Sequence, residues 1–331
     1  MNDIIDDTPE EGHEEGHEEG HVEGSGAAPE AARENTRCGF VALIGTPNAG
    51  KSTLTNTLVG TKVSIVSHKV QTTRSLVRGI AIEGATQIVL VDTPGIFAPK
   101  RRLEKAMVRS AWNGAGDADA VVLLIDARAG LNEEVESIIR GLADVRRPRA
   151  ILLNKIDLVK RESLLELAAK VAELTSFDRL FMVSALAGHG LKELRAWLAQ
   201  ILPFGPWLYP EDQISDAPMR SLAAEITREK LFHRLHEELP YRSTVETDSW
   251  QERKDGSVRI EQTIFVERES QRKIVLGKGG DTIKAISMAA RKELTEIVEA
   301  PVHLFLFVKV RENWADDPAR YREMGLDFPQ E

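Results

Sequence analysis

Several features of other protein classes are missing from this sequence. Cys38 is the only cysteine among the 331 residues, which excludes an internal disulfide and is typical of the reducing cytosol. No apolar run approaches the roughly 20 residues that cross a bilayer, and the N-terminus is acidic where a secretory signal is basic. We therefore expect a cytoplasmic protein. Its 42% hydrophobic and 29% charged residues are ordinary for a globular chain, and its length leaves room for about two domains.

The acidic charge of the chain is concentrated in its first 36 residues. These hold twelve Asp or Glu and one Arg, a charge of −11, so the remaining residues carry +2 of the total of −9. A Glu, Gly and His repeat over residues 11–24 has almost no apolar side chains, so we expect residues 1–36 to be a disordered acidic tail. His13 and His17 match a zinc-protease spacing in form only, because that chemistry needs a rigid helix and a third ligand. Weak metal binding by His13, His17 and His21 is the alternative.

A glycine-rich turn follows a buried strand that we expect over residues 39–45. It reads G-T-P-N-A-G-K-S over residues 45–52 and leads into a helix expected over 52–59. Its glycines let backbone N–H groups point at a β-phosphate, Lys51 adds a point charge, and the Ser52 hydroxyl can ligate Mg²⁺. We therefore predict a phosphate-binding loop. Its candidate residues are Gly45, Thr46, Pro47, Asn48, Ala49, Gly50, Lys51, Ser52 and Thr53.

A second phosphate-sensing segment, D-T-P-G, follows a strand expected over residues 87–91. It consists of Asp92, Thr93, Pro94 and Gly95, with Ile96 directly after it. A carboxylate at a strand end can hold Mg²⁺ through a water, and the Gly95 N–H can meet a γ-phosphate and report its loss. Further buried strands expected over 120–125 and 150–153, with a helix over 132–142 between them, predict an α/β fold with a doubly wound parallel sheet.

A base-reading loop, N-K-I-D, follows the strand expected over residues 150–153. A buried Asp157 can accept from N1–H and the N2 amine of guanine, an arrangement that adenine lacks, so we expect GTP to be preferred over ATP. The stem of Lys155 can lie over the base, and Asn154 can tie this loop, which also includes Ile156, to the phosphate loop. A strand over 180–183 leads into Ser184, Ala185 and Leu186, where a backbone N–H can reach guanine O6.

A polar stretch over residues 60–77 contains Q-T-T-R, from Gln71 to Arg74. A threonine that ligates Mg²⁺ only when the γ-phosphate is present makes a loop that is ordered in one nucleotide state and loose in the other. One of Thr72 and Thr73 should do this, and position alone does not say which.

The second half of the chain predicts an RNA-binding domain. A Pro-containing acidic linker over 203–219 follows a helix expected over 191–201. Beyond it we expect a helix over 220–238, paired strands over 244–250 and 258–266, a short helix ending at 277, a helix over 281–299 and a strand over 302–308. Between the last two helices lies G-K-G-G, a G-x-x-G that clamps about four nucleotides. This order matches a type II KH domain, a smaller α+β unit, and the alternative is a glycine-rich helix turn with solvated lysines.

The candidate RNA-binding residues are Arg272, Lys273, Ile274, Gly277, Lys278, Gly279, Gly280 and Lys284. Lys278 should contact phosphate and set affinity, while base edges should lie on an apolar groove beside the clamp. Candidates for that groove are Ile274, Val275, Ile283 and Ile286.

Together, G-T-P-N-A-G-K-S-T, Q-T-T-R, D-T-P-G, N-K-I-D and S-A-L resemble the five motifs of the Era and tRNA-modification branch of translation-factor-related GTPases. A P-loop GTPase (G) domain followed by a type II KH domain is the architecture of the Era family. Residues 274–286 resemble the RNA clamp of that family nearly throughout. The resemblance covers roughly residues 38–309. It implies a G domain at 37–202 and a KH domain at 220–311, and it leaves 312–331 as a C-terminal tail.

The resemblance also implies ligands, partners and roles. GTP or GDP is bound with Mg²⁺, whose ligands are Ser52, Thr73 and Asp92, and Lys51, Thr73 and Gly95 act in hydrolysis. Relatives with Asn at the position of Asn48 can bind K⁺ there, which supplies charge where other GTPases use an arginine finger. The family binds the 3′ end of 16S ribosomal RNA and acts in maturation of the 30S subunit. Some members of the family contact the inner membrane peripherally. We expect this protein to be a monomer.

Ile96 departs from the pattern of Ras-like proteins, which place a water-orienting glutamine there. Because an isoleucine neither donates nor accepts a hydrogen bond, we expect slow intrinsic hydrolysis. This residue keeps one alternative open, an RNA chaperone in which the nucleotide is structural. A second alternative is a small-molecule kinase, against which Asp157 and the absence of an acceptor-binding lid argue.

Overall fold

The computed structural model describes residues 35–143 and 145–329. The expected disorder of the acidic tail therefore lies, over residues 1–34, outside the described residues, as do the histidines of its repeat. Thr36, the last residue of the expected tail, accepts a hydrogen bond from the Gly205 N–H at 3.0 Å. Within them, no helix has both the length and the apolar character needed to cross a bilayer.

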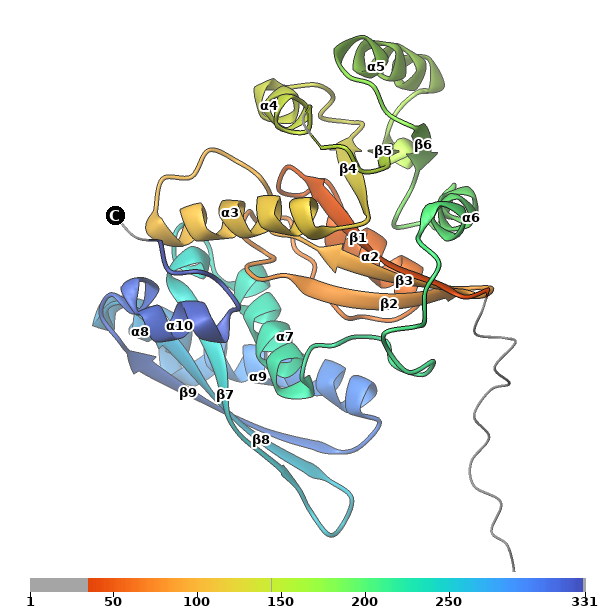
Figure 1. Ribbon diagram of the computed structural model, residues 1–331. Helices are drawn as coiled ribbons and strands as arrows, with labels where there is room; N and C mark the ends of the chain where they lie inside the picture. Colours follow the sequence, from red (N-terminus) through yellow and green to blue (C-terminus); the bar gives the residue numbers. More distant parts are fainter. Residues whose placement is uncertain (1–34, 144, 330–331) are drawn as a thin grey trace, which may run out of the picture.

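The first half of the chain forms a six-stranded sheet in the order β2-β3-β1-β4-β5-β6 (Figure 1). Its elements, in chain order, are β1 (Arg37–Gly45), α2 (Lys51–Val59), β2 (Val77–Glu83), β3 (Thr86–Asp92), α3 (Arg102–Asp117), β4 (Ala120–Asp126), α4 (Glu133–Gly141), β5 (Arg149–Asn154), η1 (Ile156–Leu158), α5 (Arg161–Leu174), β6 (Arg179–Val183) and α6 (Leu191–Ile201). The doubly wound α/β architecture is confirmed.

The expectation of a fully parallel sheet is wrong at one edge. β2 was not anticipated as a strand, and it pairs with β3 in antiparallel register, Val77 opposite Asp92 and Glu83 opposite Thr86. Only Gly84 and Ala85 separate the two strands, and a connection this short makes a hairpin and not the crossover that parallel strands need. The other neighbouring pairs are parallel.

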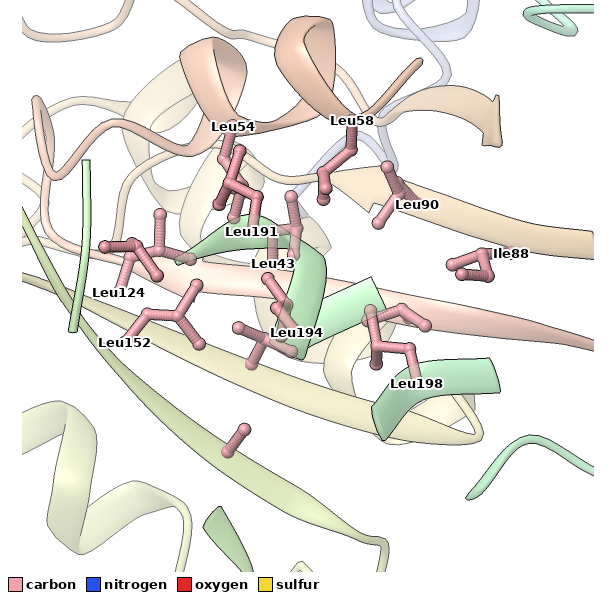
Figure 2. Packing of buried hydrophobic residues seen from close by; sticks show 14 of the residues in the cluster. Leu43, Leu54, Leu58, Ile88, Leu90, Leu124, Leu152, Leu191, Leu194 and Leu198 are labelled. Carbon is pink, nitrogen blue, oxygen red and sulfur yellow. The ribbon is translucent and has the colours of Figure 1, made fainter. Parts of the chain in front are cut away.

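Helices cover both faces of this sheet. On one face, leucines of α2 and α6 meet apolar residues of β1, β3, β4 and β5, as Figure 2 shows. On the other face, α3, α4 and α5 pack on apolar residues of β1, β4 and β5. Since both faces are buried, the strands read as continuous apolar runs.

This topology brings the sequence motifs together. The parallel strands β1, β3, β4, β5 and β6 end at Gly45, Asp92, Asp126, Asn154 and Val183. Carboxyl ends of parallel strands lie at one edge of a sheet, which is where doubly wound folds bind ligands. The segments at the ends of β1, β3, β5 and β6 carry the phosphate loop, D-T-P-G, the base-reading loop and the 184–186 turn.

The second half forms a three-stranded sheet in the order β7-β8-β9, covered on one face by helices. Its elements are α7 (Met219–Arg234), η2 (Pro240–Arg242), β7 (Ser243–Glu252), β8 (Val258–Val266), α8 (Glu269–Leu276), η3 (Lys278–Gly280), α9 (Asp281–Val298) and β9 (Val302–Val310). β8 is antiparallel to β7 and parallel to β9. The order is the expected one, although α7 ends before residue 238, and β9 extends past residue 308.

The connector and the C-terminal segment both pack on the first domain. The side chain of Gln87 on β3 bonds the backbone of Leu208 and Tyr209, so the connector is held against the first domain. The residues expected as a tail, 312–331, include η4 (Trp314–Asp316) and α10 (Pro318–Glu323). Trp314 and Tyr321 are buried against α3. The described part of this segment, 312–329, is therefore folded and contacts both domains.

Candidate functional site

A cavity of about 470 Å³ lies at the carboxyl edge of the first sheet. The phosphate loop, the polar stretch containing Gln71, Gly95, the base-reading loop and the 184–186 turn all contribute to its wall. The candidates that line it are Pro47, Asn48, Gly50, Lys51, Ser52, Thr53, Thr73, Gly95, Asn154, Lys155, Asp157, Ser184, Ala185 and Leu186. The candidates that support it from behind are Gly45, Thr46, Ala49, Asp92, Thr93, Pro94, Ile96 and Ile156.

The phosphate loop surrounds the ammonium group of its lysine, Lys51. The ammonium group of Lys51 donates to the carbonyls of Gly45 and Thr46 at 3.2 and 3.0 Å, and the residue is 6% exposed. Burial lowers the pKa of Lys51 to about 8, an effect that the charge of Asp92 opposes. A phosphate in the cavity would restore a counter-charge to this ammonium group.

Three oxygen-bearing side chains converge beside Lys51. The Ser52 hydroxyl donates to Asp92 Oδ2 at 2.6 Å and lies 2.9 Å from the Thr73 hydroxyl. The hydroxyl of Thr72 instead donates to the carbonyl of Lys69 at 2.6 Å and lies 2.7 Å from Ser67 Oγ. The geometry therefore selects Thr73, and not Thr72, as the threonine of this cluster.

The cluster fits Mg²⁺. Asp92 is fully buried, and its Oδ1 has no hydrogen-bond partner among the described residues. Burial raises the pKa of Asp92, while hydrogen bonds from Ser52 and Ser64 and the charge of Lys51 oppose the rise. Hydroxyl and carboxylate oxygens beside a phosphate site are the ligand set that Mg²⁺ prefers.

The base-reading loop is tied to the phosphate loop. The Asn154 amide donates to the carbonyl of Ala49 at 2.8 Å and accepts from the Ala185 N–H at 2.9 Å. Gly50 has a φ of +102°, and a Cβ there would lie 2.2 Å from Asn154 Nδ2, so this contact requires glycine. Asp157 is exposed at the cavity wall and not buried as expected. Only a bound base would bury this carboxylate.

Two further residues of the site were missed by sequence reasoning. Ser64 donates to Asp92 Oδ2 at 2.7 Å, and nothing in its polar surroundings singled it out. Asp126 accepts from Lys155 Nζ at 2.7 Å, and Lys155 also donates to the carbonyl of Asn48. A carboxylate at the end of β4 was a usable signal for Asp126, because loop residues at this edge of the sheet face the ligand.

Gly95 and Ile96 lie where hydrolysis would occur. A Cβ at Gly95 would lie 2.8 Å from Pro47, so the segment after β3 packs directly on the phosphate loop. The Ile96 side chain is buried in the core beneath α3, and its N–H donates to the Gly45 carbonyl at 3.0 Å. Its side chain therefore faces away from the cavity and cannot orient a water molecule.

The G-x-x-G loop is presented at the surface between α8 and α9. Gly277, Gly279 and Gly280 have φ of +77°, +62° and +84°. Lys273, Lys278, Gly279 and Lys284 are exposed, and Ile274 is 57% exposed. The loop therefore presents glycine backbone and cationic side chains at the surface, where a strand of nucleic acid can reach them.

Two of the residues expected to line the RNA groove were assigned to it wrongly. Val275 and Ile286 are fully buried in the core of the second domain, so they cannot meet bases. The helical period places them on the inner faces of α8 and α9, opposite Ile274. Arg272 is partly engaged already, since its guanidinium donates to the carbonyl of Val308 at 3.2 Å and pairs with Glu269 at 2.8 Å.

Each half of the chain matches a known protein family. The family model of the 50S ribosome-binding GTPases matches residues 40–155, and the KH domain model matches residues 238–315. GTPase Era of Brucella suis is 68% identical over 303 residues, which cover 92% of this chain and 97% of that protein. GTPase Era of Rhizobium meliloti is 67% identical over 295 residues, 89% and 94% of the two chains.

Two solved structures are similar over the whole fold. One is Era in complex with MgGDPNP and nucleotides 1506–1542 of 16S ribosomal RNA, and the other is a variant of Aquifex aeolicus Era bound to GDP and AlF4⁻. Each has a TM-score of 0.83 and 38% identity, and each match covers 88% of this chain and 99% of the other. The phosphate loop, the base-reading loop and the G-x-x-G domain thus occur here in a chain that belongs to the Era family of GTPases.

Proposed function

We propose that this protein is a GTP-hydrolysing switch that binds the 3′ end of 16S ribosomal RNA and acts in maturation of the 30S subunit. The observation that carries the proposal is the cavity where the lysine, the Mg²⁺-type oxygens and the base-reading loop meet. Its RNA part is supported by the exposed glycine loop and by the related Era solved with nucleotides 1506–1542 of that RNA.

In this proposal each residue has one task. Lys51 and the phosphate-loop backbone bind the β- and γ-phosphates, and the Gly95 N–H meets the γ-phosphate. Ser52, Thr73 and Asp92 would hold Mg²⁺, which neutralises charge on the phosphates when it is bound. The carboxylate of Asp157 reads guanine. Because Ile96 faces the core, water must be oriented by backbone, by another side chain or by a partner, which supports slow intrinsic hydrolysis.

The proposal also includes a monovalent cation and the location and partners of the protein. K⁺ binding at Asn48 is supported by its place on the cavity wall, where its amide lies 2.8 Å from the carbonyl of His68. If K⁺ binds there, the rate of GTP hydrolysis should be higher in K⁺ buffer than in Na⁺ buffer. A cytoplasmic location is supported by the single cysteine, Cys38. Peripheral contact with the inner membrane, contact with the 30S subunit and a monomeric state are supported by the family resemblance.

Exchanging Asp157 for Asn should change base specificity. The wild-type protein should prefer GTP to ATP, and Asp157→Asn should weaken GTP binding by about a hundredfold, because two charge-assisted hydrogen bonds are lost. Xanthine has a carbonyl where guanine has its amine, so the side-chain amide of this variant can donate to it. Binding of fluorescent GTP, ATP and xanthosine triphosphate measures this. Equal wild-type affinity for GTP and ATP would remove the base-reading role.

Nucleotide binding should take up a proton above about pH 8. Because burial lowers the pKa of Lys51 from 10.5 to about 8, the free protein holds this amine neutral at higher pH, while bound phosphate favours the ammonium form. Affinity for GDP should therefore fall by up to about tenfold per pH unit between pH 8 and 10.5 and level off below pH 8. Calorimetry near pH 9 in two buffers of different ionisation enthalpy should report an uptake close to one proton. No uptake at that pH contradicts the assignment.

Two exchanges at Gly279 separate charge from shape in the RNA clamp. Its φ of +62° is one that Asp and Asn tolerate, and a Cβ there would meet no neighbour within 4 Å, so both variants should fold. Gly279→Asp should weaken binding of an RNA with the 16S 3′ sequence at least about tenfold through phosphate repulsion. Gly279→Asn should weaken it less, and both should keep wild-type GTP affinity. Wild-type RNA affinity of Gly279→Asp would refute the clamp.

A further inference from the structure

The segment over residues 62–74, named here the switch segment, has no regular secondary structure of its own. Much of its support comes from α7 of the second domain, which lies beside the first sheet in Figure 1. The Val66 N–H donates to Glu229 Oε1 at 2.8 Å, and Lys62 pairs with the same carboxylate at 2.7 Å. Lys69 donates to the carbonyls of Phe232 and Leu235 at the C-terminal end of α7. The RNA-binding domain thus shapes a wall of the nucleotide cavity.

Arg228 makes the contact nearest to the Mg²⁺-type oxygens. It is 1% exposed, and its guanidinium donates to the carbonyls of Thr72 and, at 3.4 Å, of Gln71. On its other side it pairs with Glu225 through both carboxylate oxygens, and it lies over the Phe232 ring at 5.0 Å. A guanidinium held in this way has a fixed direction, which a flexible ammonium group lacks.

Arg74 makes the reciprocal contact from the first domain. It is 3% exposed and donates to the carbonyl of Ser243 at 2.9 Å and to those of Pro240 and Tyr241 at 3.4 and 3.3 Å. It also lies over the Trp314 ring at 5.5 Å. Each domain therefore sends one buried arginine into the backbone of the other.

Thr73 lies between these two anchors. Arg228 binds the carbonyls of the two residues before it, Gln71 and Thr72. The side chain of the residue after it, Arg74, is held in the second domain. Its hydroxyl is 2.9 Å from Ser52 Oγ. Ser52 is on α2 and Asp92 ends β3, so regular elements of the first domain place both. Thr73 is the member of the cluster whose position depends on the other domain.

We propose that Arg228 is a positioning residue of the GTPase site, through which the RNA-binding domain holds Thr73 where it can ligate the Mg²⁺ of GTP. The inference rests on the proposed function, since it takes Thr73 as a Mg²⁺ ligand. It adds that the second domain completes the nucleotide site from the same chain. GDP does not need Thr73, so Arg228 should act on the triphosphate state and not on nucleotide binding in general.

The test compares a non-hydrolysable GTP analogue with Mg²⁺ against GDP without Mg²⁺ on the full chain. Arg228→Met keeps apolar length over Phe232 and removes every donor. It should weaken analogue binding about tenfold or more, raise the Mg²⁺ concentration for half-maximal binding and lower kcat, with GDP affinity within about twofold of wild type. Arg228→Lys keeps the charge and should recover part of the analogue affinity. It also allows the test if the Met variant does not fold.

The matched control is Arg220→Met on the same helix. Arg220 also donates to backbone carbonyls, those of Thr247 and Asp248, but these lie within the second domain. This variant should leave the ratio of analogue to GDP affinity, and kcat, at wild-type values. In a Thr73→Ala background, Arg228→Met should cause no further loss of analogue affinity.

Two results overturn the inference. One is an unchanged analogue-to-GDP ratio in both Arg228 variants, and the other is an equal loss of analogue and GDP binding, which would make Arg228 a packing residue only. A Thr73→Ala variant that keeps the wild-type ratio would instead refute the Mg²⁺ role in the proposed function. The two failures are thus distinguishable.

Discussion

We propose that the nucleotide site depends on the meeting of three oxygen atoms, those of Ser52, Thr73 and Asp92, which converge beside the buried Lys51. Each is positioned by a different kind of structure. The register of β3 in the sheet places Asp92, and the first turn of α2 places Ser52. Contacts between domains hold the backbone around Thr73. The cluster is complete only when the sheet, the helix and the contacts between the domains all hold their residues in place. A site with this dependence can respond to the bound nucleotide as a switch.

Ion pairs connect the switch segment to two helices of the RNA-binding domain. Lys62 of the switch segment pairs with Glu229 on α7 and with Glu293 on α9, the helix that begins directly after the G-x-x-G loop. Lys230 joins the same two carboxylates. Because these groups are largely shielded from solvent, the network is less screened than surface pairs would be. These lysines and carboxylates are the groups through which a shift of α9 would reach the switch segment.

Local patterns were sufficient for most of the nucleotide site and insufficient where long-range packing decides. Glycine turns after apolar strands predicted the phosphate and base-reading loops, since those motifs carry their own backbone requirements. The pattern could not choose between Thr72 and Thr73, because that choice depends on packing against α7, which is distant in the sequence. Val275 and Ile286 were misplaced because an apolar residue beside a binding loop can belong to the groove or the core. The edge strand β2 and the folded segment at Trp314 were missed for a related reason, since each is stabilised by distant elements.

We infer that nucleotide state and RNA occupancy bias each other through the contact between the two domains. Thermodynamic linkage requires that the factor by which RNA changes nucleotide affinity equals the factor by which the nucleotide changes RNA affinity. The most direct measurement is the Kd of a 16S 3′-end RNA for the protein loaded with Mg²⁺ and a GTP analogue, compared with the Kd for the GDP-loaded protein. The account predicts that the two values differ by about fivefold or more. Identical values would contradict it, even if both ligands bind tightly.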